Sequence, residues 1–127
     1  MADMRTPLSR VRGLGSAKEG VDHFWMQRIT AVALVPLMLV FIASMASQAD
    51  ASHAEFSEWL RSPLTAVPLL LLVGAGFFHM KLGMQVVIED YIHKEGSKIA
   101  LLTLNNFWAA TGGLLSVYSI LKIALGA

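Results

Sequence analysis

Four polar residues in this sequence lie within or at the edges of apolar stretches, and their side chains could carry cofactor chemistry. They are His79, Asp90, Tyr91 and Arg28. A polar side chain at membrane depth costs free energy, so a function or a partner is expected to offset it. The chain has no cysteine, which excludes disulfides and metal ligation by thiolates. Metal or cofactor chemistry must therefore use His, Met, Asp, Glu or Tyr side chains.

His79 suits the role of a metal ligand because, of the four histidines, it is the one well within an apolar stretch. A neutral histidine that bonds to a neighbouring helix is an equally good interpretation. On a helix, Gly83 lies one turn further along the same face, which predicts an unshielded approach for a flat, bulky group. The apolar side chains nearby suit either a macrocycle or ordinary packing; they are Phe77, Phe78, Met80 and Met84.

Residues 89–93, Glu-Asp-Tyr-Ile-His, bring two carboxylates, a phenol and an imidazole to the end of an apolar stretch. Charged residues commonly mark the end of a membrane span, and this ordinary explanation covers Glu89. Asp90 differs, because its spacing puts it about 20° from His79 around a helix and about 16 Å along it. Tyr91 follows at about 120°, where its hydroxyl could donate to a carbonyl of a lipid-soluble ligand. Asp90 would orient that phenol or relay protons.

Arg28 stands at the inner end of the first apolar stretch, in the same membrane leaflet as Tyr91. An arginine in this position is ordinarily a positive-inside anchor. The functional alternative is that its guanidinium faces a carboxylate, such as a haem propionate, or the ligand near Tyr91. The sequence alone leaves both interpretations open.

The elements that hold these residues follow from the shortage of charge. The 127 residues are 55% hydrophobic and 15% charged, against about a quarter charged in a soluble domain, which excludes an ordinary soluble enzyme. The net charge of +1 gives no reason to expect a basic face for nucleic acid. A bilayer core needs about 20 residues of helix. Three intervals without Asp, Glu, Lys or Arg meet that length, at 29–49, 62–80 and 99–121.

We therefore predict an all-α integral membrane protein, a single domain with three transmembrane helices. The predicted segments are an N-terminal segment over 1–28, spans over about 29–49, 63–90 and 99–125, an outer loop over 50–62 and an inner loop over 91–98. Residues 1–20 are expected to be irregular or to be held by a partner. Lys and Arg are concentrated before the first span and in the inner loop, which predicts a cytoplasmic N-terminus. Lys81 lies inside the second span and must reach the interface or find a partner.

Two motifs extend these observations. The first, over residues 20–31, reads Gly-Val-Asp-His-Phe-Trp-Met-Gln-Arg-Ile-Thr-Ala and enters the first span. The second, over residues 79–91, reads His-Met-Lys-Leu-Gly-Met-Gln-Val-Val-Ile-Glu-Asp-Tyr. Both resemble motifs of the small hydrophobic membrane-anchor subunit, the D subunit, of bacterial succinate dehydrogenase, respiratory complex II. Size, three spans and an inside N-terminus extend the resemblance over nearly the whole chain.

The resemblance implies that His79 is an axial ligand of haem b, with the second ligand from a larger cytochrome b anchor subunit that completes the helical bundle. Tyr91 would hydrogen-bond a carbonyl of ubiquinone, Asp90 would support that site and its proton supply, and Arg28 would line the same region. A flavoprotein subunit would oxidise succinate and an iron-sulfur subunit would carry the electrons, so this chain would not be catalytic alone. The complex would serve electron transport and the tricarboxylic acid cycle in the bacterial inner membrane. No role carries over to Lys81.

Three other functions compete with this expectation. A haem-free structural anchor would need His79 only for packing. A fumarate reductase anchor has a similar pattern and differs through the spacing of His79 and the Asp90-Tyr91 pair. A small transporter subunit has a similar size, but the first span has no acidic residue for proton coupling, and three spans give no inverted repeat.

Overall fold

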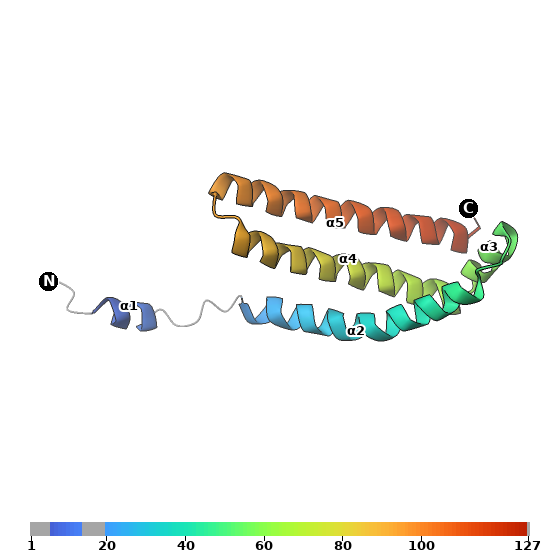
Figure 1. Ribbon diagram of the computed structural model, residues 1–127, viewed down its shortest axis with the longest axis horizontal. Coiled ribbons are helices and arrows are strands. Elements are labelled where there is room, and N and C mark those ends of the chain that lie inside the picture. Colours follow the sequence, from blue (N-terminus) through green and yellow to red (C-terminus); the bar gives the residue numbers. More distant parts are fainter. Residues whose placement is uncertain (1–5, 14–19, 127) are drawn as a thin grey trace.

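The structure is a computed structural model that describes residues 6–13 and 20–126 of the chain. These residues form helices and connecting turns, with no strand among them. In chain order the elements are α1 (Pro7–Gly13), α2 (Gly20–Ser47), α3 (His53–Arg61), α4 (Pro63–Tyr91) and α5 (Glu95–Ala124) (Figure 1). The predicted all-α membrane class is therefore confirmed.

Three of the described helices, α2, α4 and α5, are long and apolar enough to cross a membrane. They have 28, 29 and 30 residues, or about 42–45 Å at the helical rise. The hydrocarbon core of a bilayer is about 30 Å thick, so their ends extend into the headgroup region. This explains why α2 begins at Gly20 and not at the predicted residue 29. Charged residues mark where a helix leaves the lipid, but the helix itself can continue past them. Asp22, in the first turn of α2, also interacts favourably with the helix dipole.

The three long helices form a single antiparallel layer with α4 in the middle (Figure 1). α4 packs against α2 on one side and α5 on the other, while α2 and α5 make no contact with each other within the described residues. The start of α2, the end of α4 and the start of α5 lie at one end of the layer (Figure 1). The inner ends of the predicted spans therefore share one end, which we call the Arg28 end.

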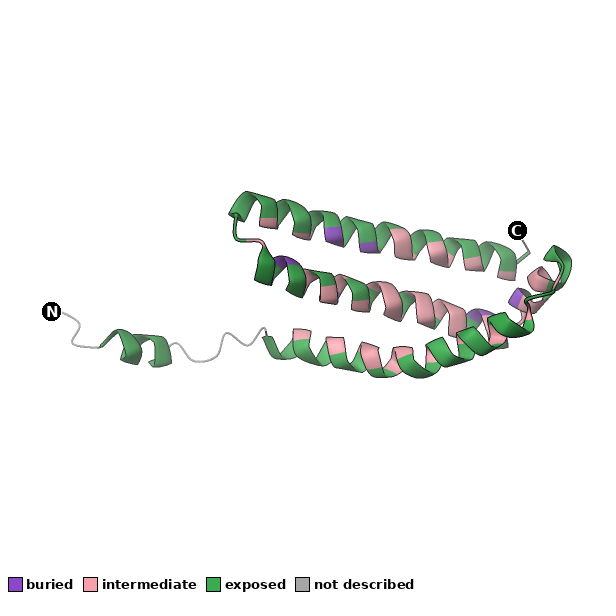
Figure 2. Cartoon of the chain, viewed as in Figure 1, coloured by how far each residue is buried: buried purple, intermediate pink, exposed green. Residues whose placement is uncertain are grey.

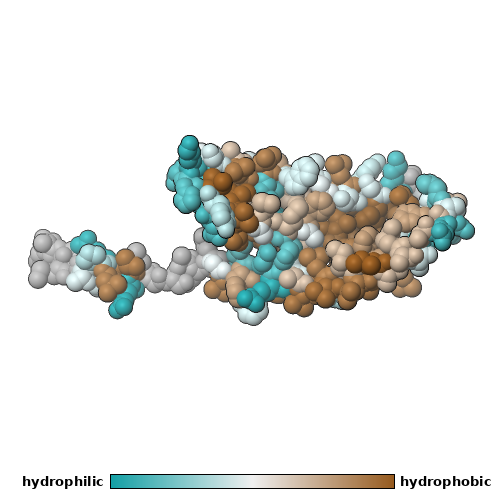
Figure 3. All heavy atoms as spheres, viewed as in Figure 1, coloured by the Kyte–Doolittle hydropathy of each residue, from teal (hydrophilic) through white to brown (hydrophobic). Residues whose placement is uncertain are grey.

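Burial is confined to the seams between helices. The buried apolar residues are Leu60, Ala66, Leu82, Ile88 and Ala109, and the outward faces of the long helices are exposed (Figure 2). Apolar atoms cover most of the face shown in Figure 3, with hydrophilic atoms mainly toward the two ends. A layer with so much exposed apolar surface is stable only where lipid or other chains cover it.

Helix α3 is an element that the sequence analysis missed, because residues 50–62 were expected to be a loop. Ser52 and Glu55 form a capping box, in which the Ser52 N–H donates to the Glu55 carboxylate (2.8 Å) and the Glu55 N–H donates to the Ser52 hydroxyl (3.4 Å). These bonds satisfy donors that a helix start otherwise leaves unpaired. Leu60 of α3 is buried, and the helix packs against both α4 and α5.

Helix α1 corrects the expectation that residues 1–20 are irregular. Pro7 occupies its first position, and the Ser9 N–H donates to the Thr6 hydroxyl (3.1 Å). Both features are typical of a helix start. The rest of that expectation, over residues 1–5 and 14–19, lies outside the described residues.

Candidate functional site

His79 lies in the seam between α4 and α2 and is half-buried. Its Nδ1 lies 2.9 Å from the hydroxyl oxygen of Thr30, and its Nε2 lies 3.4 Å from the amide nitrogen of Gln27. Thr30 and Gln27 are three residues apart on α2, so one face of that helix meets both ring nitrogens. The histidine is thus directed away from α5 and toward the first span.

A groove of about 380 Å³ opens beside His79 between α2 and α4. Arg28 lines this groove together with His79, so the structure brings two of the four predicted site residues together. The guanidinium carbon of Arg28 lies 4.2 Å from the centre of the Phe24 ring, a cation–π contact that holds the charge at the Arg28 end. The groove therefore combines a histidine with a fixed positive charge.

Two polar atoms in this groove are buried without a hydrogen-bond partner among the described residues. They are the Nε2 of His23 and the Oε1 of Gln27. Buried polar atoms in folded proteins almost always have a partner. These two atoms mark the α2 side of the groove as a place where a group from outside this chain would satisfy hydrogen bonds.

The predicted open approach past Gly83 is wrong, because a side chain from α2 occupies that space. A Cβ atom at Gly83 would lie 3.4 Å from the amide nitrogen of Gln27. The glycine therefore makes room for Gln27, and the groove on the Arg28 side is the open route to His79.

The four neighbours expected around a macrocycle do not line the groove of His79. Met80 and Met84 line a second groove, between α4 and α5. Phe77 and Phe78 line a third, on another part of the same seam. Side chains next to His79 in sequence are directed about 100° or more away from it around the helix, so α5 receives them while α2 receives His79.

Tyr91 is 75% exposed and lines the second groove, which is apolar and has a volume of about 560 Å³. Trp108 and Leu104 of α5 form the opposite wall. The structure therefore separates Tyr91 from His79: both lie on α4, but each faces a different neighbouring helix. The phenol at the Arg28 end of an apolar groove can donate a hydrogen bond to a ligand whose remainder is apolar.

Asp90 is exposed in the last turn of α4, and its side chain makes no hydrogen bond or ion pair within the described residues. Beside it, the Gln85 amide donates to the Glu89 carboxylate (2.9 Å), and the Lys98 ammonium donates to the Glu89 carbonyl (3.3 Å). Lys98, in the first turn of α5, thus caps the C-terminal end of α4, where the helix dipole favours a positive charge. Asp90 is left free to face another molecule.

Lys81 lines the third groove, which has a volume of about 500 Å³ and includes Asn106 and Gly113 of α5. Its backbone carbonyl accepts a hydrogen bond from the Asn105 amide (2.9 Å). Among the described residues its ammonium has no partner, so the two expectations, that Lys81 reaches the interface or pairs with another subunit, stay predictions.

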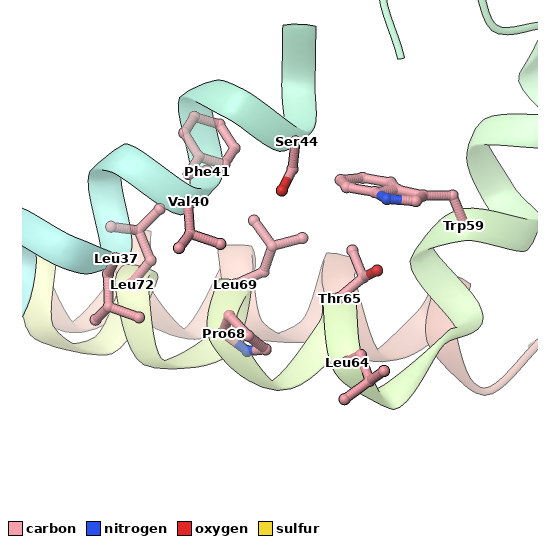
Figure 4. Close-up of a pocket in the computed structure, with 10 residues that line it drawn as sticks. All are labelled: Leu37, Val40, Phe41, Ser44, Trp59, Leu64, Thr65, Pro68, Leu69 and Leu72. Atoms are coloured by element: carbon pink, nitrogen blue, oxygen red, sulfur yellow. The ribbon is translucent and has the colours of Figure 1, made fainter. Parts of the chain in front are cut away.

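At the far end of the layer, a groove of about 330 Å³ follows the end of α2 and is lined by Asp50 and Glu55 among others. Trp59 of α3 and Ser44 of α2 border a cavity of about 40 Å³ between α2 and α4 (Figure 4). That volume holds no more than a few water molecules. His79 and Arg28 line one groove and Tyr91 another, and neither of these is at the far end.

Thr30 and Gln27 are the contacts of His79 that the sequence analysis missed. A signal for them was present, because His23, Gln27 and Thr30 follow an i, i+4, i+7 pattern on one face of α2. Three polar residues on one face of an otherwise apolar helix indicate a face directed at another polar group.

Comparison with known proteins agrees with this architecture. A family model described as the succinate dehydrogenase/fumarate reductase transmembrane subunit matches residues 2–114. The chain is similar to a succinate dehydrogenase hydrophobic membrane anchor subunit of Rickettsia bellii, 39% identical over 71% of this chain and 72% of the relative. It is also similar to the subunit of that name from Paracoccus denitrificans, 32% identical over 96% of this chain and 94% of the relative. No solved structure shows significant similarity.

Proposed function

Since this chain belongs to the succinate dehydrogenase/fumarate reductase transmembrane subunit family, as one of its non-catalytic hydrophobic membrane anchors, we propose that it helps to bind haem b and to form a site of ubiquinone reduction. The observation that carries the haem proposal is the groove where a half-buried His79 and Arg28 meet. A haem bound in this groove would accept and donate one electron at a time.

The residues present fit a haem shared between two chains. The described residues contain no group of three or more His, Asp or Glu that could hold a metal ion. A haem would bring nitrogen ligands of its own, so His79 would be sufficient as the donor from this chain. Arg28 would pair with a propionate by charge-assisted hydrogen bonds, and the unpartnered Nε2 of His23 lies in the same groove.

The second axial ligand would come from a cytochrome b anchor subunit. The open single layer supports such a partner, because α2 and α5 do not close on each other and leave the faces of α4 uncovered. A second set of helices against this layer would cover the groove of His79. The three spans and their partner would then form one bundle.

The quinone proposal rests on Tyr91 and the apolar groove that it borders. Ubiquinone is an apolar molecule with carbonyl oxygens, and the neutral phenol would donate a hydrogen bond to one of them. Reduction of the quinone takes up two electrons and two protons. Asp90 would support the delivery of those protons, and Arg28 lies at the same end of the layer.

We infer that the Arg28 end lies at the cytoplasmic face of the bacterial inner membrane. Arg28 lies in α2, Arg10 and Arg12 precede it in the sequence, and Lys94 and Lys98 flank the start of α5, which supports a cytoplasmic N-terminus. Flavoprotein and iron-sulfur subunits of the complex would dock at the same face. Electrons from succinate and protons from the cytoplasm would then reach the quinone from one side.

Purification of the intact complex through a tagged copy of this chain tests the proposal. We expect a flavoprotein, an iron-sulfur protein and a second membrane anchor to copurify in mild detergent, together with a haem b spectrum and succinate-dependent quinone reduction. Copurification of all subunits without haem would instead make the chain a structural anchor. Absence of the flavoprotein and iron-sulfur subunits would overturn the proposal as a whole.

A further inference from the structure

The Thr30 hydroxyl sits at the junction of three polar atoms. Its oxygen lies 2.7 Å from the Met26 carbonyl oxygen, 3.1 Å from the Gln27 carbonyl oxygen and 2.9 Å from the Nδ1 of His79. The two carbonyl oxygens only accept hydrogen bonds, whereas the hydroxyl has a single proton to donate. If the hydroxyl donates its proton to a carbonyl oxygen, the hydroxyl oxygen must therefore accept the hydrogen bond from His79.

The two shortest distances from the Thr30 oxygen indicate which group donates in each hydrogen bond. An oxygen–oxygen separation of 2.7 Å is the most common length of an O–H···O hydrogen bond, so the Thr30 proton is donated to the Met26 carbonyl. The hydroxyl oxygen then accepts from His79, and Nδ1 of the imidazole must carry the hydrogen. In a neutral imidazole the other nitrogen, Nε2, then holds the lone pair.

The contact at Nε2 agrees with this tautomer. The Gln27 amide nitrogen, which is a donor, lies 3.4 Å from Nε2, beyond the usual range for an N–H hydrogen bond. This weak bond yields readily to a stronger partner. The lone pair of Nε2 is therefore present and held only loosely.

We propose that Thr30 is a positioning residue, which fixes His79 as the Nδ1–H tautomer and turns Nε2 into the axial ligand. This inference rests on the proposed binding of haem by His79. A metal-bound histidine needs an acceptor for its second ring N–H, because that bond fixes the ring and makes it a stronger electron donor. Here the acceptor is on α2 and the histidine is on α4. The orientation of the His79 ring therefore depends on how α2 packs against α4.

The test compares two variants of Thr30 in the purified complex. Thr30→Val keeps the shape of the side chain and removes the acceptor, whereas Thr30→Ser keeps the hydroxyl. Loss of the acceptor makes the imidazole a poorer donor to ferric iron, so the haem midpoint potential should rise in the valine variant. We expect about a tenfold change in the reduction equilibrium, or about 59 mV for a one-electron couple, with the serine variant close to wild type.

Three controls keep the test decisive. Thr65→Val changes a threonine of α4 near Trp59, at the far end of the layer, and should leave the potential unchanged. Thr30→Ala removes the hydroxyl with less bulk and is measured in the same way if the valine variant does not assemble. His79→Ala tests the proposed function itself, through loss of the bis-histidine low-spin signal.

The outcomes separate the two proposals. An unchanged potential and unchanged low-spin spectrum in Thr30→Val, with a clear change in His79→Ala, would overturn the role of Thr30 alone. A change of equal size in Thr30→Ser would also overturn it, because shape and not the hydroxyl would then matter. An unchanged spectrum in His79→Ala would overturn the haem proposal on which this inference rests.

Discussion

Gly112 of α5 lies so close to the Phe77 ring of α4 that a Cβ atom at Gly112 would come within 2.5 Å of a ring carbon. The neighbouring Gly113 faces the same ring, but a Cβ there would lie at an ordinary contact distance of 3.7 Å. Gly112 therefore fixes the closest approach of the two helices. Small residues at such positions allow transmembrane helices to pack closely.

This difference predicts opposite effects for two neighbouring glycines. Gly112→Ala should destabilise the packing of α4 against α5 by about 1–3 kcal/mol, the usual cost of overpacking. Gly113→Ala adds the same methyl group where room exists and should be tolerated or slightly stabilising. Unfolding of the protein in mixed detergent micelles measures both, and an equal loss of stability in the two variants would contradict the packing argument.

Asn105 provides a second test of the same seam. It is 7% exposed and donates from its amide to the Lys81 carbonyl across the helices. Asn105→Leu should cost about 0.6 kcal/mol, and up to about 1.7, in the range measured for hydrogen bonds between membrane helices. Asn106→Leu, at an exposed position, is the matched control. If both substitutions leave the unfolding midpoint unchanged, the hydrogen bond does not stabilise the seam.

The two tyrosines separate quinone chemistry from general effects on the membrane helices. Tyr91→Phe should lower quinone reductase activity and leave the haem spectrum unchanged, because the substitution removes a single hydrogen-bond donor. A net hydrogen bond of about 0.5–1.5 kcal/mol corresponds to a loss of up to about tenfold. Tyr118→Phe, on the exposed face of α5, should retain full activity. Undiminished turnover in Tyr91→Phe would remove this residue from the quinone site.

The stability of the α3 cap depends on pH through Glu55, which lies outside the membrane spans. The hydroxyl and then the backbone N–H of Ser52 donate to its carboxylate, which lowers the pKa of Glu55 below its ordinary value of 4.5. A lowered folded-state pKa gives stability that is present above the unfolded pKa and lost as the pH falls through the folded pKa. The cap of α3 should therefore loosen only in acid, below about pH 4.5.

A carboxyl NMR titration of Glu55 in the detergent-solubilised protein measures this effect. Ser52→Ala should return the pKa of Glu55 toward its ordinary value. Ser57→Ala, whose hydroxyl donates to the His53 carbonyl (2.8 Å), should leave that pKa where it is. Identical titrations of wild type and Ser52→Ala would show that the capping box does not hold the carboxylate.

The sequence predicted the number and approximate position of the spans, because lipid excludes charge and the charge-free intervals are long enough to cross it. It did not predict the start of α2 at Gly20, since a helix can continue past the charges that mark the membrane surface. The sequence did not lead to a prediction of helix α3, although Ser52 and Glu55 have the residue types and spacing of a capping box. A loop was expected there from polarity alone.

The sequence proposed residues for the candidate site but could not give their geometry. A helical wheel relates residues on one helix, so it gave the directions of Gly83, Asp90 and Tyr91 relative to His79. It cannot say which neighbouring helix each direction meets. That depends on the packing of α2 and α5 on opposite sides of α4, which fills the space at Gly83 with Gln27. The haem and quinone roles stay predictions.

The most direct test of haem ligation by His79 is the electron paramagnetic resonance spectrum of the oxidised complex that carries His79→Ala. The spectrum reports the axial ligands of a haem even where the haem is retained without one of them. If His79 ligates the haem, the low-spin signal is lost in this variant and kept in His53→Ala, a histidine at the start of α3. A wild-type low-spin signal at full haem content in His79→Ala would contradict the assignment of His79 as a haem ligand.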